Sequence, residues 1–357
     1  MRVAYQSESS AVSSTKHELD GSDHTNISDT LPDESARFSV NRLGRWAIVL
    51  LLIVMFGIFS ALKPDLFFTG SNVRVMVIGQ ATTLLLAMAV IVPLRAGDFD
   101  LSVASVMVVT ACLVGWLVSH GIPALAACIL AVLVGPVVGV VNGMLVVRCG
   151  INSFIATLGM VTVGYGVATA ISGGTIVSSL PAGLVHFTSV NFLALPMPVW
   201  IGWLVALLVW YLFEFTPAGR YLLFIGGSRS AASLAGLRVP AYRQAAFVFS
   251  GTLSAVTGLL YAGTLGAVDP SSASSYLLPP ITAVFLGASV VQIGRFNVIG
   301  SIVGIYLLAI GITGLQLLGV QDWISNVFDG GVLIIAVLVG ILLQGRERST
   351  ASTGALG

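Results

Sequence analysis

The sequence predicts an all-α polytopic membrane protein, with about ten transmembrane helices in one bundle and both termini in the cytoplasm. Of its 357 residues, 56% are hydrophobic and only 9% are charged, whereas soluble domains carry roughly a quarter charged residues. The apolar residues form long uninterrupted runs, and the basic residues gather on one side of those runs. Such runs must face lipid or one another.

Ten apolar segments approach the roughly 20 residues that a helix needs to cross a bilayer. They are about 46–62, 73–93, 101–119, 122–147, 152–172, 198–214, 244–266, 277–292, 297–319 and 323–343. The third and the eighth begin beside polar or proline-rich sequence, so each could be a full span or a broken, re-entrant helix.

The basic residues support this count and set the orientation. With the N-terminus inside and the spans alternating, Lys63 and Arg74 fall outside. The inside holds the rest of the arginines near the spans: Arg37, Arg42, Arg45, Arg95, Arg148, Arg220, Arg229, Arg238, Arg243, Arg295, Arg346 and Arg348. This positive-inside bias places both termini in the cytoplasm.

The two ends of the chain differ from its middle. Residues 1–42 are rich in Ser, Asp, Glu and Thr, which predicts a disordered cytoplasmic tail because such a segment buries too little apolar surface to fold. Residues 43–345 form the expected transmembrane domain, and 346–357 a short cytoplasmic tail.

Glycines recur at four-residue spacing in two of the expected spans. The fourth span carries Gly135, Gly139 and Gly143, and the ninth carries Gly300 and Gly304. Small residues one turn apart let helix backbones approach closely in lipid, so we expect a tightly packed bundle.

The sequence excludes several kinds of chemistry. The chain has two lysines, Lys16 and Lys63, and neither follows a glycine, so a phosphate-binding loop of the GxxxxGK[ST] type is impossible. No paired cysteine motif, HExxH or Ser-His-Asp spacing is present, and a net charge of +1 gives no field for nucleic acid. We expect no catalytic residues, no metal site and no directly bound cofactor.

Acidic residues within apolar segments leave two interpretations open. Asp98 and Asp100 lie at the start of the third segment, and Asp329 lies in the tenth. Such residues can cap helices, or they can bind protons or sodium in an ion-coupled secondary transporter of a small polar solute.

The longest inside loop, 215–243, combines four arginines with small residues. Within it, Ser228 is a plausible N-cap, an Ala-rich stretch follows, and Gly236 and Pro240 are stop signals. These signals predict a short helix at the cytoplasmic surface. The loop could serve as a docking site for a partner or be an ordinary solvated loop.

Four stretches, in order, resemble the membrane subunits of ribose-type sugar ABC importers. They are GDFDLSVASVMVV (97–109), INSFIATLGMVTVGYGVATAISGG (151–174), TPAGRYLLFIGGSRSAASLAGLRV (216–239) and ITAVFLGASVVQIGRFNVIGSIVG (281–304). The resemblance runs from about residue 46 to 343. This chain departs from the family pattern where Asp98, Ala104, Ala288, Ile293 and Phe296 replace glycines and Phe99 replaces isoleucine.

The resemblance implies a permease in the inner membrane that imports a monosaccharide, either a pentose, a hexose or a related polyol. It implies three protein partners in the bilayer or beside it: a cytoplasmic ABC ATPase that binds the ATP, an extracytoplasmic sugar-binding protein, and a second permease copy or paralogue. It also implies that loop 215–243 couples to the ATPase, through Arg220, Gly226, Gly227, Arg229, Ala231, Ala232 and Gly236.

A sugar path needs short polar groups and aromatic faces without fixed charge at its narrowest point. Such groups gather at the starts of the third and fifth segments: Asp100, Ser102, Ser105, Asn152, Phe154 and Thr157. At helical spacing Phe154 and Thr157 share a face. These residues could line the path or only cap and pack helices, in which case the next candidates are Thr282 and Phe285 in the eighth segment.

Overall fold

The computed structural model describes residues 34–288, 292 and 294–353, with side chains between 48 and 338. The chain forms two compact units, Met1–Asn41 and Arg42–Gly357. Of the first unit only the helical stretch from Glu34 lies within the described residues, so the expected disordered tail falls mainly outside them. The second unit holds all the sites considered below.

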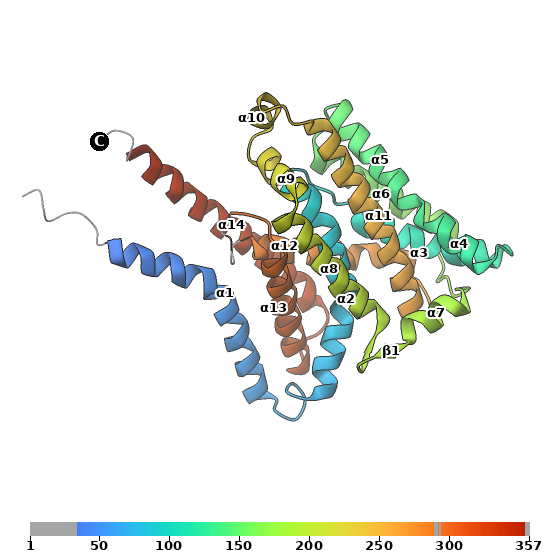
Figure 1. Cartoon of the computed structure of the whole chain (residues 1–357). Helices are drawn as coiled ribbons and strands as arrows, with labels where there is room; N and C mark the ends of the chain where they lie inside the picture. Colours follow the sequence, from blue (N-terminus) through green and yellow to red (C-terminus); the bar gives the residue numbers. More distant parts are fainter. Residues whose placement is uncertain (1–33, 289–291, 293, 354–357) are drawn as a thin grey trace, which may run out of the picture. The chain divides into compact units, whose positions relative to one another are not determined.

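The regular secondary structure of the described part is helical apart from one two-stranded sheet and one isolated bridge, Val177 to Val268 (Figure 1). The longer helices are α1 (Glu34–Leu62), α2 (Gly70–Arg95), α3 (Val103–Ser119), α6 (Ser153–Ser172), α8 (Met197–Phe215), α11 (Val239–Leu265), α13 (Val298–Leu317) and α14 (Trp323–Thr353). The shorter elements are α4 (Ala124–Val132), α5 (Val134–Gly143), the π-helix η2 (Met144–Arg148), α7 (Ala182–Ser189), β1 (Asn191–Phe192), β2 (Leu195–Pro196), α9 (Pro217–Gly227), α10 (Arg229–Leu234), the 3₁₀ helix η3 (Pro270–Tyr276) and α12 (Leu278–Gly287).

Six helical stretches of the described part are long and apolar enough to cross a membrane: α2, α4 to η2, α6, α8, α11 and α13. Three shorter apolar stretches lie at 48–62, 103–119 and 323–338. The chain is therefore an all-α polytopic membrane protein, as the composition predicts.

The eighth expected segment, 277–292, differs from a continuous span. Its helix, α12, has ten residues and ends at Gly287, with the 3₁₀ helix η3 directly before it. At 1.5 Å per residue such a helix is about 15 Å long, half of the roughly 30 Å hydrocarbon core. The proline pair Pro279 and Pro280 suits a first helical turn, where a missing N–H is tolerated.

Burial separates a central group of helices from a peripheral one. In the most apolar stretches of α2 and α11, 67% of the residues are buried, against 11% in α6 and 22% in α4 to η2. Twelve of the 17 residues of α3 are buried, and α3 packs against α11 and α6. The exposed apolar faces of α6 and α4 are suited to contact with lipid or with another membrane protein.

The spaced glycines bring helix backbones into contact, as predicted. A Cβ on Gly135 would collide with the Gly251 carbonyl oxygen, and one on Gly139 would lie 2.7 Å from the Val248 Cα atom. The partner of the α5 glycines is therefore α11. Gly300 and Gly304 of α13 approach Gly287 and Ala283 of α12 in the same way.

Helix α2 is separated from α3 by an irregular segment, residues 96–102, which we call the α2–α3 segment. It turns at Gly97, whose φ of 78° is accessible mainly to glycine. The buried Arg95 anchors the end of α2: its guanidinium donates to the Phe296 carbonyl oxygen at 3.3 Å and lies 4.1 Å from the centre of the Phe213 ring. The third expected segment, 101–119, thus begins within the irregular α2–α3 segment, and its helix starts at Val103.

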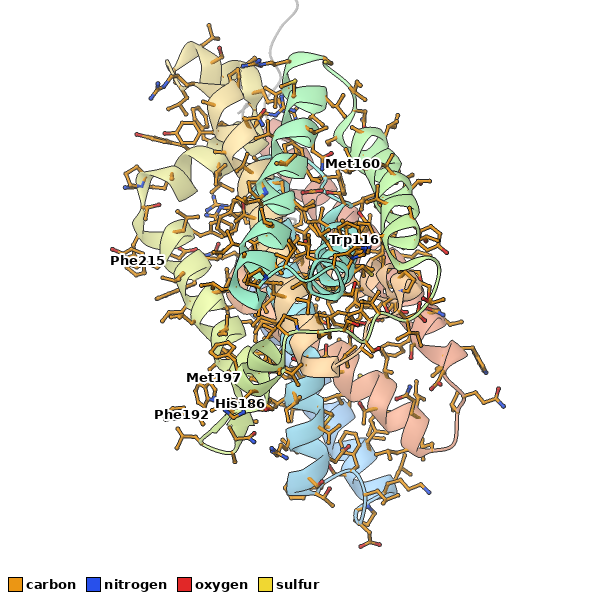
Figure 2. All side chains as sticks on the ribbon, turned by 90° about the vertical axis from the view of Figure 1, so that its right-hand side faces the viewer. Trp116, Met160, His186, Phe192, Met197 and Phe215 are labelled. Atoms are coloured by element: carbon orange, nitrogen blue, oxygen red, sulfur yellow. The ribbon has the colours of Figure 1, made fainter. Side chains whose placement is uncertain are left out.

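The two ends of α8 lead into different structures (Figure 2). Near Met197, the β1–β2 hairpin and α7 form a small cap that includes His186 and Phe192. The Arg74 Nε atom donates to the Ala194 carbonyl oxygen of this hairpin at 2.7 Å. At the other end, beyond Phe215, the chain continues into α9 and α10.

Candidate functional site

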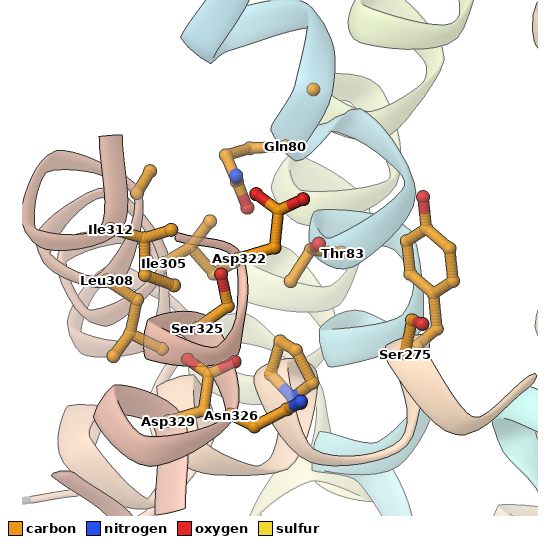
Figure 3. A pocket seen from close by; sticks show the side chains of 14 residues that line it. Gln80, Thr83, Ser275, Ile305, Leu308, Ile312, Asp322, Ser325, Asn326 and Asp329 are labelled. Carbon is orange, nitrogen blue, oxygen red and sulfur yellow. The ribbon is translucent and has the colours of Figure 1, made fainter. Parts of the chain in front are cut away.

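A polar cavity of about 450 Å³ lies among α2, η3, α12, α13 and α14 (Figure 3). Its volume falls in the range of about 300–1,000 Å³ that is typical of small-molecule sites. Eight of its lining residues carry polar side chains: Gln80, Thr83, Ser275, Tyr276, Asp322, Ser325, Asn326 and Asp329. The remaining wall is small or apolar: Gly79, Pro279, Ile305, Leu308, Ala309 and Ile312.

Asp329 is the most deeply placed acid of the cavity. It is 6% exposed, and its Oδ1 atom has no hydrogen-bond partner among the described residues. A buried carboxylate oxygen without a partner is costly, so a bound hydroxyl or a water would satisfy it. Ser325 lies one helical turn earlier on α14, and Figure 3 shows both side chains on the cavity side of this helix.

The cavity wall is tied to α12. The Thr282 hydroxyl, which is fully buried, donates to the Asp329 backbone carbonyl oxygen at 3.4 Å. Asp322 accepts from Gln316 Nε2 at 3.3 Å. Asp329 of α14 is thus tied to α12, and Asp322, which directly precedes α14, is tied to Gln316 of α13.

The lining residues include two carboxylates and no Lys, Arg or His. A ligand with a carboxylate of its own would meet repulsion without a compensating cation. A neutral ligand rich in hydroxyls can instead donate to Asp329 and Asp322 and exchange hydrogen bonds with Gln80 and Asn326. Its less polar face can pack on the apolar wall.

The predicted path residues of the third segment lie in packed surroundings outside this cavity. Asp100 and Ser102 are fully buried, and Asp100 Oδ1 accepts from the Ser102 backbone N–H at 3.0 Å and from its hydroxyl at 2.6 Å. Asn142 Nδ2 of α5 donates to Ser102 Oγ at 2.8 Å. Ser102, the residue before α3, makes no side-chain cap bond, and Asp100 Oδ2 is buried without a hydrogen-bond partner among the described residues, so Asp100 holds a buried turn and does not cap the helix.

Ser105, one turn further on, lines a separate cleft of about 110 Å³ whose other lining residues are apolar or glycine. Its hydroxyl donates to the Ser102 carbonyl oxygen at 2.9 Å. Ser105 therefore satisfies its own hydrogen bond within α3.

The predicted residues of the fifth segment do not form one lining. Asn152 caps α6 by accepting from the Phe154 backbone N–H at 2.9 Å. Phe154 is 47% exposed, whereas Thr157 is fully buried and donates to the Ser153 carbonyl oxygen at 2.7 Å. The structure brings Phe154 within 6.1 Å of Phe99, between ring centres, but places none of these residues at the polar cavity.

The predicted short surface helix is α10, with Ser228 at its N-cap accepting from the Ala231 backbone N–H at 3.2 Å. Arg229, one of the residues through which the resemblance implies coupling to the ATPase, bonds to the α2–α3 segment. Its Nη2 atom donates to Asp98 Oδ1 and to the Gly97 carbonyl oxygen, both at 2.9 Å. Arg229 thus bonds within the chain while 48% of its side chain stays exposed.

Two small residues of this loop serve internal packing. Ala232 is fully buried beside Ile225 and Val239, so it is not part of an outer docking surface. A Cβ on Gly226 would collide with the Arg95 carbonyl oxygen. Their small size lets α9 and α10 pack against the rest of the chain.

The other expected coupling residues remain accessible. Arg220, Gly227 and Gly236 are exposed, and Ala231 is half-buried. Gly236 has a φ of 81°, so it ends α10 in a conformation that favours glycine. Leu234, which the sequence reasoning missed, is 90% exposed at the end of α10.

Sequence reasoning also missed most of the cavity. Asp329 is one of the acids singled out in the sequence. Gln80 and Thr83, however, come from α2, near the start of the transmembrane domain, whereas Asp329 lies in α14, near its end. One available signal was the spacing of Ser325, Asn326 and Asp329, which places polar groups one turn apart at the start of an apolar segment.

Apolar helices around a polar cavity that opens to the surface are typical of a polytopic membrane transport protein. The chain belongs to the family described as the permease component of branched-chain amino acid transport systems, whose sequence profile matches residues 74–337.

Individual relatives are sugar permeases by name. The ribose import permease protein of Haemophilus influenzae is 28% identical over 313 residues, which cover 86% of this chain and 97% of that protein. The ribose import permease protein of Bacillus subtilis is 30% identical, covering 84% and 92%. The D-allose transport system permease protein of Escherichia coli is 27% identical, also covering 84% and 92%. No solved structure matches.

Proposed function

We propose that this chain is the transmembrane permease subunit of an ATP-binding-cassette importer for a monosaccharide, and that the polar cavity receives the sugar. The observation that carries the proposal is the cavity lining: eight polar side chains, two of them carboxylates, with no basic residue. The relatives named as ribose and D-allose permeases support the same cargo class.

The lining discriminates between two cargoes. The family description mentions branched-chain amino acids, whose ammonium group could pair with a carboxylate of the cavity but whose own carboxylate would find no cation there. A sugar carries no charge and offers several hydroxyl donors to Asp329, Asp322 and Asn326. The chemistry of the cavity therefore favours a sugar or a related polyol.

The proposed topology has ten membrane-embedded segments with both termini in the cytoplasm. The six long apolar helices, the three shorter apolar stretches and α12 supply ten segments. In this arrangement η3 and α12 together form one broken crossing, because α12 alone is too short and an even number of crossings is needed to bring both termini to one side. The hydrogen bond from Arg95 to the Phe296 carbonyl oxygen supports this, since it joins the chain just after α12 to the end of α2. The bias of arginines toward one side of the segments supports the orientation in the inner membrane.

The proposed importer contains three further components. A cytoplasmic ATPase binds and hydrolyses ATP, docking on α9 and α10, where Arg220, Gly227 and Leu234 are exposed. An extracytoplasmic sugar-binding protein delivers the cargo, and a second permease copy or paralogue completes the pore. The permease itself is not an enzyme.

Sugar uptake by the native host tests this function. Deleting the gene should abolish uptake of one labelled sugar from a panel that includes D-ribose and D-allose, and the plasmid-borne gene should restore it. Uptake of labelled L-leucine is the matched control and should not change. Lost leucine uptake with unchanged uptake of every sugar would contradict the proposed cargo.

A second arm separates the importer from an ion-coupled transporter. Collapsing the proton and sodium gradients while ATP is maintained should leave the restored sugar uptake largely intact. Uptake that follows the ion gradients and persists without ATP would show an ion-coupled transporter, whose ion site would then be sought among the buried acids.

A further inference from the structure

The buried carboxylate of Asp98 lies where three parts of the fold meet. Its side chain is only 2% exposed, and it sits in the α2–α3 segment. Arg243 of α11 binds it with two donors, Nε to Oδ2 at 2.6 Å and Nη2 to Oδ1 at 2.8 Å. Arg229 of α10 donates to Oδ1 at 2.9 Å. Both oxygens of Asp98 are therefore engaged by cations.

The two arginines differ in how firmly they bind Asp98. The side chain of Arg243 is 11% exposed, and its paired donors fix the relative orientation of the two groups. Arg229 uses a single nitrogen and is 48% exposed. The Arg243 pair is thus a fixed anchor, whereas the Arg229 contact can loosen with little desolvation change when α10 shifts.

The next residue, Phe99, packs against two helices of the bundle, α6 and α12. Its ring stacks on Phe285 of α12 at 6.0 Å between ring centres and meets Phe154 of α6 edge-on at 6.1 Å. The Phe99 backbone N–H donates to Ser153 Oγ at 3.0 Å. A displacement of the α2–α3 segment would therefore press on α6 and on α12 together.

Helix α12 reaches the polar cavity at its other end. Phe285 lies one turn after Thr282, whose hydroxyl bonds to the Asp329 carbonyl oxygen, and Pro279 lines the cavity itself. A continuous series of packed groups thus runs from α10 to the cavity. Such series transmit movement when they contain a contact with two arrangements.

We propose that Asp98 is a positioning residue that couples α10 to the sugar cavity, by holding Phe99 against α12 according to whether Arg229 is engaged. Docking and closure of the ATPase on α10 would pull Arg229, move the α2–α3 segment and change the packing of Phe285. The inference rests on the proposed function, because it gives the loop-to-cavity route within that importer.

The test uses the complex that copurifies with the tagged permease from its host, reconstituted in proteoliposomes. Two quantities are measured: ATP hydrolysis and the number of ATP molecules hydrolysed per sugar transported, with D-ribose and D-allose as the probes. Arg229→Gln removes the exposed contact and leaves the Arg243 anchor. Arg148→Gln is the matched control, since Arg148 is also exposed at a helix end and carries the same charge change.

For Arg229→Gln we expect ATPase association and hydrolysis to persist while the ATP-to-sugar ratio rises about tenfold, in the range of typical coupling effects. Asp98→Asn should do the same, and because Asp98 is buried it cannot act by touching the ATPase. Arg148→Gln should keep the wild-type ratio.

An unchanged ratio in Arg229→Gln, with sugar uptake present in the wild type, overturns the coupling role of Asp98 and leaves the proposed function standing. If the Asp98→Asn protein does not accumulate in the membrane, the ATP-to-sugar ratio of Arg229→Gln alone decides the test. Absence of sugar uptake in the wild-type complex would instead count against the proposed function.

Discussion

The Thr282 hydroxyl donates to the Asp329 backbone carbonyl oxygen, so the short helix α12 is bonded to the wall of the polar cavity. This contact joins an element that is too short to span a membrane to the acid with an unpartnered oxygen. A short helix that borders a polar cavity lets the irregular backbone before it face protein and the cavity, where it is tolerated, and not lipid.

Thr282→Val should lower stability by about 1 kcal/mol, because the change keeps the shape of the side chain and removes one buried hydrogen bond. The measurement is the thermal unfolding midpoint of the detergent-solubilised protein. Thr162→Val is the control, since Thr162 lies on an exposed face of α6 and its hydroxyl contacts only its own helix, at 3.5 Å. Equal midpoints for the two variants would show that the Thr282 hydroxyl does not stabilise the contact between α12 and α14.

The close packing of α5 on α11 predicts a difference in stability between two glycine variants. Gly139→Ala should destabilise the protein by about 1–3 kcal/mol, because the added Cβ would lie 2.7 Å from the Val248 Cα atom. Gly159→Ala on α6 has open space within 4 Å and should be neutral or stabilising, by up to about 1 kcal/mol. Thermal unfolding compares them, and a Gly139→Ala variant as stable as the wild type would contradict the close approach.

The exposed end of α10 predicts where the ATPase docks. Leu234→Asp should abolish copurification of the ATPase while the permease still accumulates in the membrane, because Leu234 is 90% exposed and a charge there would need desolvation on docking. Leu193→Asp is the matched control, as Leu193 is 73% exposed in the hairpin at the other end of α8. ATPase recovery with Leu234→Asp at the wild-type level would place the docking surface elsewhere.

Gly236→Trp is a less specific probe of the same loop. The positive φ of Gly236 means that any side chain there strains the end of α10, so lost association would not isolate docking. Leu234→Asp avoids this problem because its backbone is helical.

The proposed orientation predicts labelling from one side only. After replacement of the three native cysteines, single cysteines at Lys63, His120, His186 or Gln321 should react with a membrane-impermeant maleimide added to intact cells. Cysteines at Arg229 or Arg295 should react only after the cells are opened. Labelling of the latter positions in intact cells would reverse the orientation.

Local features were predictable from the sequence, and long-range ones were not. The capping role of Asn152 depends on an N–H two residues away, and the glycine spacing in α5 depends on one helix. Asp98, in contrast, bonds with arginines 131 and 145 residues away, so nothing near it in the sequence reveals its partners.

The cavity could not be predicted from the sequence for the same reason, because its lining residues lie far apart along the chain. Its polar groups come from α2, η3 and the stretch 322–329, and those of α2 and α14 lie in apolar segments, where helix packing explains them equally well. The residues expected to form the path, such as Asp100 and Thr157, stood out because they cluster in the sequence, and the structure places them in buried hydrogen bonds outside the cavity.

The central claim is that the cavity around Asp329 receives the sugar, and the concentration dependence of ATP-driven sugar uptake tests it most directly. Proteoliposomes with the copurified complex should show a KM raised about tenfold to a hundredfold for Asp329→Asn, because a hydrogen bond to a charged acceptor contributes about 1.5–3 kcal/mol. Asp65→Asn, an exposed acid between α1 and α2, should keep the wild-type KM. A wild-type KM and maximal rate in the Asp329→Asn complex would contradict the account.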